Sequence, residues 1–377
     1  MLVSLVAVRT AGIEAWGAFV GAMVLVHLCA QIADFGSRDA LVRAFAGDPA
    51  GVRRSWRTAF SARAPLLLLG PLVFLASGND LWTAGLLCGW MTGLFVSRLH
   101  DGVVAFRRAF GFALWVEVAV VALTLAAVMG AGSSLSVTGL LAVFTVAAWV
   151  RALAVTARFD VLRPGPGWHW SSSRDLRRSW PFFGLGFSGA VQSRVDLYVV
   201  AALLPAPVLG TYQVLTGFVL LVQSLSGALL GPIVPALYRL GRPGVLRGAR
   251  RLAAAGLVGS SAGALGAWVA MTRLYHLEVQ PAAIVVAWLA MLPVYAYSPL
   301  VHLAFREGDE RIVLASNVAG IAVAGGGTML LAPALGIVGA MAAAAAAQAV
   351  ILALHVARTL RRSAEVRSPA AAVEARW

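Results

Sequence analysis

Apolar and polar positions follow one another in long blocks along the chain. Apolar stretches of about twenty residues recur, and short segments rich in arginine, glycine or proline separate them. A helix of that length rises 1.5 Å per residue and crosses a hydrocarbon core of about 30 Å. The pattern predicts membrane-spanning helices near residues 14–36, 62–77, 81–97, 110–130, 136–157, 180–203, 207–231, 250–272, 281–303, 311–331 and 335–357. We therefore predict an all-α polytopic membrane protein with about eleven full transmembrane helices.

The first eight residues are also apolar, but eight residues make only about 12 Å of helix. We expect them to be the remnant of a first helix, which would bring the full arrangement to twelve.

The arginines sort the connections between the predicted spans into two sets. All but three of the 30 basic residues, each of them an arginine, fall in alternate connections or in the tail from residue 358. Connections that retain arginine lie on the cytoplasmic side of a membrane. The sequence therefore predicts a multi-pass protein of the inner (cytoplasmic) membrane with its C-terminus in the cytoplasm.

Composition supports the membrane assignment, since 60% of the residues are apolar and 12% are charged. Soluble domains have about 45–50% and about 25%. The net charge of +14 is spread over many connections. A nucleic-acid surface would gather such charge in one basic patch, so we expect no nucleic-acid partner.

A faint internal duplication divides the chain. Trp16-Gly17-Ala18-Phe19 opens one predicted span and Leu209-Gly210-Thr211-Tyr212 opens another with the same direction through the membrane. Parallel repeats of this kind occur in transporters, whose substrate site lies between the halves. We expect two six-helix lobes around a central cavity. The predicted boundaries are an N-terminal lobe at 1–160, a cytoplasmic linker at 161–178, a C-terminal lobe at 179–358 and a cytoplasmic tail at 359–377.

Motifs for catalysis are missing from the sequence. The chain has no lysine and therefore no phosphate-binding G-x-x-x-x-G-K loop, and it has no H-E-x-x-H or C-x-x-C. Residues 184–189 fit G-x-G-x-x-G, but they lie inside a predicted span with no strand before them, so helix packing explains them better. We expect no enzyme activity, no catalytic residue, no metal and no cofactor.

Arg194 and Asp196 lie deep inside a predicted span. On a continuous helix two positions are about 200° apart, so the two side chains should point in opposite directions, Asp196 with Gln192 and Arg194 with Tyr198. Intramembrane charges face a cavity or a partner. One interpretation is a water-filled cavity in which Arg194 binds an anionic group and Asp196 couples to an ion. The other is interhelical ion pairing that only stabilises the bundle.

Three further charged residues are candidates for the substrate site. Glu117 lies about two turns inside its span, where it would pair with a cavity arginine or snorkel to the interface. Asp34 and Arg38 are four residues apart at the end of the first full span, a spacing that suits an ion pair on a helix.

Several short segments, in this order, resemble the Wzx-type polysaccharide flippases of the multidrug/oligosaccharidyl-lipid/polysaccharide exporter superfamily. They are Gly17 with Asp34-Phe35-Gly36 and Arg43, Trp180-Pro181-Phe182-Phe183 with Arg194-x-Asp196, Gly210-Thr211-Tyr212, and Asn317 with Gly336-Ile337-Val338-Gly339-Ala340. The resemblance covers nearly the whole chain, although most of the family's first helix is missing.

The resemblance implies a flippase that carries an oligosaccharide on a polyprenyl pyrophosphate to the outer face by alternating access, driven by H⁺ or Na⁺. The product would enter lipopolysaccharide or exopolysaccharide biosynthesis. Arg194 is the residue expected to bind the pyrophosphate, because its planar fork holds two oxygens at once. Two alternatives remain, a cation-coupled drug antiporter of the same superfamily and a membrane polysaccharide polymerase or ligase.

Overall fold

The computed structural model describes residues 1–159, 161 and 173–367, and every regular element among them is helical. Most of the predicted linker and the end of the predicted tail, residues 162–172 and 368–377, lie outside the described residues. Residue contacts divide the chain into two compact units. Unit 1 comprises Met1–Val191 with Pro205–Gly210, and unit 2 comprises Gln192–Leu204 with Thr211–Trp377. The predicted lobe boundaries stay a prediction.

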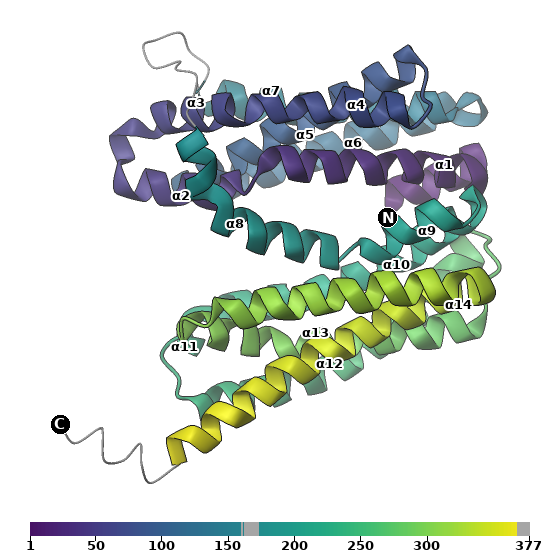
Figure 1. Cartoon of the computed structure of the whole chain (residues 1–377). Helices are drawn as coiled ribbons and strands as arrows, with labels where there is room; N and C mark the ends of the chain where they lie inside the picture. The colour runs from purple at the N-terminus through teal and green to yellow at the C-terminus, as the bar shows by residue number, and fades with distance from the viewer. Residues whose placement is uncertain (160, 162–172, 368–377) are drawn as a thin grey trace. The chain divides into compact units, whose positions relative to one another are not determined.

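Unit 1 contains the first eight α-helices (Figure 1). They are α1 (Leu2–Asp34), α2 (Ser37–Gly47), α3 (Val52–Arg63), α4 (Leu69–Ala76), α5 (Leu81–Arg107), α6 (Phe110–Ala131), α7 (Val137–Phe159) and α8 (Ser173–Gln192). Short 3-10 turns η1 (Pro49–Gly51), η2 (Ala64–Leu68) and η3 (Gly132–Ser134) join some of them. Gly12, at φ 87°, breaks α1 into a short first piece and a long second one. A positive φ of this kind costs glycine little.

The core of unit 1 surrounds α5, which packs against α1, α2 and α7. Its buried members at one end are Ala33, Leu41, Phe45, Val52, Trp56, Ala59, Phe95, Val96, Leu99, Val103, Ala152 and Val161. The Asp80 carboxylate caps α5 by accepting from the backbone N–H groups of Trp82 and Thr83 at 2.9 and 3.0 Å. The cap fixes where this central helix begins.

Unit 2 contains the remaining helices. They are α9 (Val195–Leu203), α10 (Ala206–Leu230, from Thr211 onward), η4 (Gly231–Ile233), α11 (Val234–Leu237), α12 (Arg242–Val269), the π-helical turn η5 (Ala270–Leu274), α13 (Pro281–Arg306) and α14 (Glu310–Arg367). α14 breaks at Gly336, where φ is 57°, so it forms two helices joined by a turn.

Glycines allow the helices of unit 2 to approach one another closely. A Cβ at Gly256 would lie 2.4 Å from Cγ of Tyr295 on α13, and a Cβ at Gly263 would lie 2.3 Å from Cγ2 of Val222 on α10. Small residues at such contacts are the usual way in which membrane helices associate. They place α10 and α13 firmly against α12.

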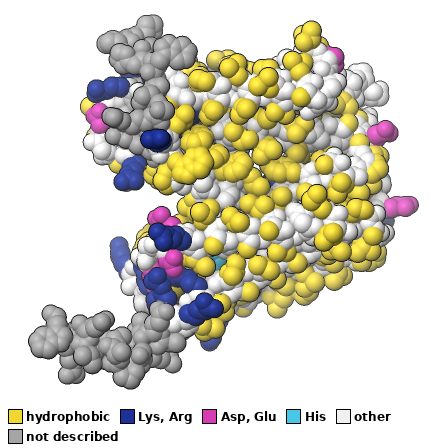
Figure 2. All heavy atoms as spheres, in the orientation of Figure 1, with side chains coloured by type: hydrophobic (Ala, Val, Ile, Leu, Met, Phe, Trp, Pro, Cys, Tyr) yellow, Lys and Arg dark blue, Asp and Glu magenta, His cyan; other side chains and the backbone are white. Residues whose placement is uncertain are grey.

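The number of membrane spans agrees with the sequence prediction. Within the described residues, eight helical stretches are long and apolar enough to cross a membrane. One of the eight stretches contains α14, which Gly336 divides into two spans. The α5 helix and the α8–α9 pair are not among the eight and add two further spans. The all-α fold with about eleven helices is confirmed, and the chain is a multi-pass membrane protein. Figure 2 shows apolar side chains over the visible flanks of the helices.

Candidate functional site: a polar pocket in unit 2

A break in the chain between α8 and α9 shapes the pocket. α8 ends at Gln192 and α9 begins at Val195, because Arg194 leaves the helical region with φ −143° and ψ −2°. Arg194 and Asp196 therefore line the same pocket, together with Gln192. The prediction that Arg194 and Asp196 point in opposite directions is wrong, since it assumed a continuous helix through Arg194.

Four parts of unit 2 form the wall of the pocket: the segment around the α8–α9 break, α10, α13 and both halves of α14. The lining residues are Gln192, Ser193, Arg194, Asp196, Leu197, Thr216, Val219, Leu220, Gln223, Ala290, Ala324, Met341, Ala344, Ala347 and Gln348. The cavity has a volume of about 40 Å³. It therefore has room for about three water molecules.

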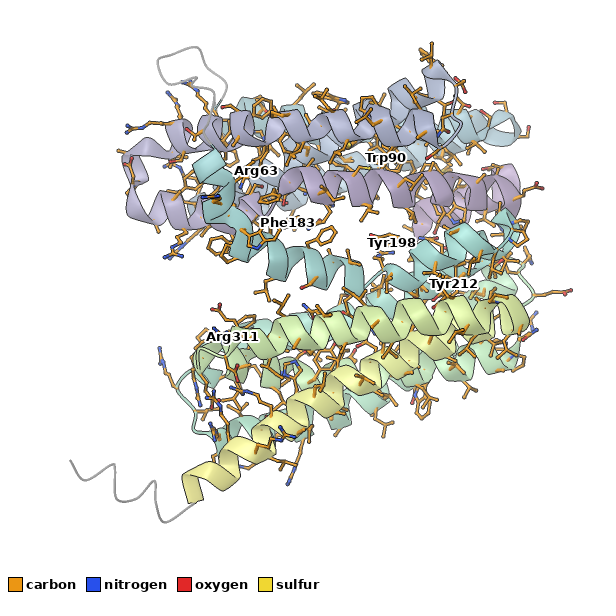
Figure 3. The ribbon with its side chains drawn as sticks, in the orientation of Figure 1. Arg63, Trp90, Phe183, Tyr198, Tyr212 and Arg311 are labelled. Carbon is orange, nitrogen blue, oxygen red and sulfur yellow. The ribbon has the colours of Figure 1, made fainter. Side chains whose placement is uncertain are left out.

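Asp196 is fixed by its neighbours. The residue is buried, and its carboxylate accepts a hydrogen bond from the hydroxyl of the fully buried Tyr212 on α10, which Figure 3 labels. Asp196 also lies in the first turn of α9. Because the N-terminus of a helix carries partial positive charge, a carboxylate is favoured there.

Arg194 is the positively charged residue of the pocket. It is half-buried, and its guanidinium makes no hydrogen bond or ion pair with any residue that the structure describes. A guanidinium inside a membrane span costs at least about 2.5–3.5 kcal/mol unless water or an anion reaches it. The guanidinium of Arg194 is therefore suited to bind an anion.

Hydrogen bonds hold two other polar side chains of the pocket lining, Gln223 and Gln348, in place. The amide nitrogen Nε2 of Gln223 donates to the carbonyl oxygen of Ala290 at 3.0 Å. The hydroxyl of Tyr297 donates to Oε1 of Gln348 at 2.9 Å. A Cβ at Gly320 would lie 2.9 Å from Cγ of Gln192, so this glycine leaves room for the glutamine.

Sequence reasoning missed Gln223, Gln348 and the role of Tyr212. The signal that would have found the two glutamines is their polar side chain inside apolar runs. No sequence signal pairs Tyr212 with Asp196, because the pairing depends on how α9 packs against α10.

Tyr198 is half-buried on α9 and is not part of the pocket lining (Figure 3). Its predicted role in substrate binding stays a prediction.

Glu117 belongs to an ion-pair group in unit 1. Nε of Arg151 on α7 lies 2.7 Å from Oε1 of Glu117 on α6. A second guanidinium nitrogen of Arg151 lies 3.5 Å from Oδ1 of Asp101 on α5. Glu117 is thus paired with an arginine, but Arg151 does not line the pocket of unit 2, so the predicted pairing with a cavity arginine stays a prediction. The two ion pairs join three helices.

The predicted ion pair between Asp34 and Arg38 is wrong. The chain turns between them at Phe35 and Gly36, both at positive φ (45° and 66°), so the spacing of a continuous helix does not apply. Asp34 is buried and accepts a hydrogen bond from Ser37, whereas Arg38 is exposed. Neither residue lines the pocket of unit 2.

Arg63 organises this turn. The fully buried guanidinium, labelled in Figure 3, donates to the carbonyl oxygens of Asp34 at 2.8 Å, Ala59 at 3.2 Å and Phe35 at 3.4 Å, and to Oγ of Ser179 on α8 at 2.7 Å. A satisfied arginine of this kind is a structural element of unit 1, and sequence reasoning gave it no role.

Two of the segments that carry the family resemblance meet at the same turn. Phe35 stacks on Phe183 of α8 with ring centroids 4.3 Å apart. A Cβ at Gly36 would lie 2.6 Å from the backbone nitrogen of Phe183, so only glycine permits this approach. Asp34-Phe35-Gly36 and Trp180-Pro181-Phe182-Phe183 therefore form one contact within unit 1.

Comparison with known proteins supports the fold. The sequence matches no protein-family model and no curated protein sequence. In structure, the chain is similar to the lipid II flippase MurJ in an inward closed conformation, with a TM-score of 0.73 and 10% identity over 94% of this chain and 84% of that one. It is also similar to an inward-facing multidrug resistance MATE family transporter of the MOP superfamily, with a TM-score of 0.64 and 13% identity over 97% and 94%. The chain has the all-α fold of these transporters.

Proposed function

We propose that the protein is a flippase that moves an oligosaccharide linked to polyprenyl pyrophosphate from the inner to the outer face of the cytoplasmic membrane. The cargo would serve lipopolysaccharide or exopolysaccharide biosynthesis, as in the Wzx-type proteins that the sequence resembles. The observation that carries the proposal is Arg194, whose guanidinium lines a polar pocket and makes no hydrogen bond or ion pair with the described residues.

Arginine suits this cargo because its planar fork binds two phosphate oxygens at once. The cavity is too small for an oligosaccharide, with about 40 Å³ of accessible space, so it would receive only a small charged group while the sugar stays outside it. One structure with the same fold is named a lipid II flippase, and that name supports a lipid-linked cargo.

Asp196 would couple transport to a gradient of H⁺ or Na⁺. It shares the pocket with Arg194, and Tyr212 and the N-terminus of α9 hold its carboxylate in place. Binding of a cation near Asp196 changes the charge that Arg194 and its anion experience, because charges interact strongly at low dielectric. Gln192, at the end of α8, would complete the polar lining.

Deletion of the gene tests the function directly. Without the protein, lipid-linked repeat units should accumulate on the cytoplasmic side of the membrane. Wild type and Arg273→Ala should relieve the accumulation, because Arg273 is exposed in η5 and does not line the pocket. Arg194→Ala should not relieve it. No accumulation in the deletion strain would contradict the flippase proposal, and full relief by Arg194→Ala would remove Arg194 from the mechanism.

A cation-coupled antiporter is the second candidate, and the similarity to a multidrug resistance transporter favours it. Proteoliposomes that contain the purified protein separate the two functions. An antiporter would expel a cationic dye such as ethidium when a H⁺ or Na⁺ gradient is applied. We expect no gradient-driven dye movement.

A further inference from the structure

Three exposed arginines form a group on α12. Arg247, Arg250 and Arg251 follow the spacing i, i+3 and i+4, so their side chains share one face of the helix. All three are exposed. None of them makes a hydrogen bond or ion pair with another part of the chain that the structure describes.

This face is opposite the one by which α12 packs into unit 2. The buried residues of α12 are Val245, Ala249, Leu252, Gly256, Ser260, Ala264 and Ala267. At 100° per residue, all of them except Ala264 lie on the side away from the three arginines, and Ala264 lies about 90° from the middle of the arginine face. The arginines therefore do not belong to the interior of the bundle.

An exposed apolar stripe continues the arginine face along the helix. Its large members are Leu257, Val258, Leu265, Trp268 and Val269, which are 45–71% exposed. They lie within about 80° of the direction of Arg247. Large apolar side chains that are exposed in the middle of a spanning helix contact lipid chains, so this face of α12 is turned to the bilayer.

The depth of the arginines follows from the length of the helix. Arg251 and Arg273 near the other end are about 33 Å apart along the axis. This separation matches the hydrocarbon thickness of about 30 Å. Arg247, Arg250 and Arg251 therefore lie at and just beyond the edge of the hydrocarbon, where phosphate headgroups are found.

Other arginines at the same end of unit 2 serve the bundle itself. Arg242 lies 2.7 Å from one carboxylate oxygen of Glu307, and Arg358 lies 2.7 Å from the other. Arg358 also lies 2.8 Å from the carboxylate of Asp309. The acidic residues of the α13–α14 connection neutralise these arginines. The three arginines on α12 have no such ion pair with the described residues, so their positive charge can act on a ligand.

We propose that Arg247, Arg250 and Arg251 form a binding site for the headgroup of an anionic phospholipid. The lipid would lie with its phosphate against the three guanidinium groups and its chains along Leu257, Val258 and Leu265. A phospholipid fits both parts of the face, the charged end and the apolar stripe, whereas a soluble acidic protein or free phosphate would use only the charged end. The site is independent of the transport function proposed above.

Native mass spectrometry of the full chain in detergent, titrated with dioleoyl-phosphatidylglycerol, tests the site. An arginine near an anionic surface strengthens binding about fivefold. The triple variant Arg247→Gln, Arg250→Gln, Arg251→Gln should therefore bind phosphatidylglycerol at least about tenfold more weakly. Higher salt should weaken binding to the wild type. Dioleoyl-phosphatidylcholine, which has no net charge, should bind wild type and variant equally.

A matched control removes the same charge elsewhere. Arg239, Arg311 and Arg361 are also exposed, but they come from three different segments. Their triple change to Gln should weaken phosphatidylglycerol binding less than about threefold, since each interacts alone with a headgroup. An equal loss of phosphatidylglycerol binding in both triple variants would show that binding depends only on the net charge of the protein, and would overturn the proposal. Unchanged binding in the α12 variant would overturn it as well.

Discussion

Unit 1 and unit 2 both place charged side chains within membrane-spanning helices, but they satisfy them differently. In unit 1, Arg63 donates four hydrogen bonds to neighbouring oxygens, and Arg151 pairs with Glu117 and Asp101. In unit 2, Arg194 lines a polar pocket, and its guanidinium makes no hydrogen bond or ion pair with the described residues. The same residue type therefore stabilises the structure in one unit and stays available to a ligand in the other.

The difference shows how to separate structural from functional charges in a membrane protein. A paired arginine offsets its own desolvation through fixed oxygens, so removing it costs stability. An unpaired arginine in a polar pocket is supported by water or ligand, so removing it should affect binding more than folding. Stability measurements on both kinds of residue test this distinction.

Arg63 provides the largest expected effect on stability. Arg63→Ala should destabilise the protein by about 3 kcal/mol, because it leaves carbonyl oxygens without donors and opens a cavity in unit 1. Chemical unfolding in detergent measures the loss. Arg54→Ala is the control, since its side chain is 72% exposed, and it should change stability by less than about 0.5 kcal/mol. Equal effects at the two positions would remove the structural role of Arg63.

Substitution of Gly17, at a helix contact within unit 1, is expected to cause the second largest loss of stability. A Cβ at Gly17 would lie 1.7 Å from the carbonyl oxygen of Ala206, so the contact must open. Gly17→Ala should cost about 2 kcal/mol in a thermal unfolding assay. Gly21 lies one turn further along the same face, and a Cβ there would lie 3.7 Å from Cδ2 of Leu209. Gly21→Ala should be tolerated, and similar losses for both would contradict the close contact.

Glu307 and Asp309 test whether unit 2 also uses paired charges at the ends of its helices. Burial alone would raise the pKa of Glu307, but hydrogen bonds and charge from Arg242 and Arg358 lower it overall. The hydrogen bond from Arg358 lowers the pKa of Asp309, and the charges of Arg358 and Arg362 add to this effect. A carboxylate whose folded pKa is depressed adds stability above its unfolded pKa, about 4, and loses it as pH falls through the folded value.

The double variant Glu307→Gln, Asp309→Asn should therefore be less stable than wild type at pH 7, by about 2 kcal/mol. The difference should shrink as the pH falls below about 4, where wild type loses the same interactions. Unfolding midpoints measured from pH 7 to pH 2 follow this change. A difference that does not depend on pH would show that the ion pairs contribute nothing.

Substitution of Glu117 is expected to have the smallest effect on the stability of the protein. Its side chain is 44% exposed and that of Arg151 is 33% exposed, so solvent weakens their attraction. Glu117→Gln should lower the stability of the protein by less than about 1 kcal/mol in the same unfolding assay. A loss as large as that expected for Arg63→Ala would show that the ion-pair group is as important to unit 1 as the buried arginine.

Sequence patterns predicted the helical class and about eleven spans, because length and hydropathy decide whether a segment crosses a membrane. They also singled out Arg194 and Asp196, since charges at membrane depth are rare, and Gln192, four positions before Asp196. All three line the pocket, and their role in substrate binding stays a prediction. The mistakes share one cause. Arg194, Phe35 and Gly36 leave the helical conformation, so arguments from helical spacing fail at Arg194–Asp196 and at Asp34–Arg38. Tyr212, Gln223 and Gln348 reach the pocket through packing between distant segments, which local patterns do not contain.

The most direct test measures transport by the purified protein. Proteoliposomes would carry a polyprenyl pyrophosphate with a short fluorescent oligosaccharide, and a membrane-impermeant quencher would report its movement between leaflets. Wild type and Arg273→Gln should move the lipid at similar rates, while Arg194→Gln should fall to the rate of protein-free liposomes and keep wild-type thermal stability. Movement at the wild-type rate by Arg194→Gln would contradict the view that the unpaired guanidinium of unit 2 binds the cargo.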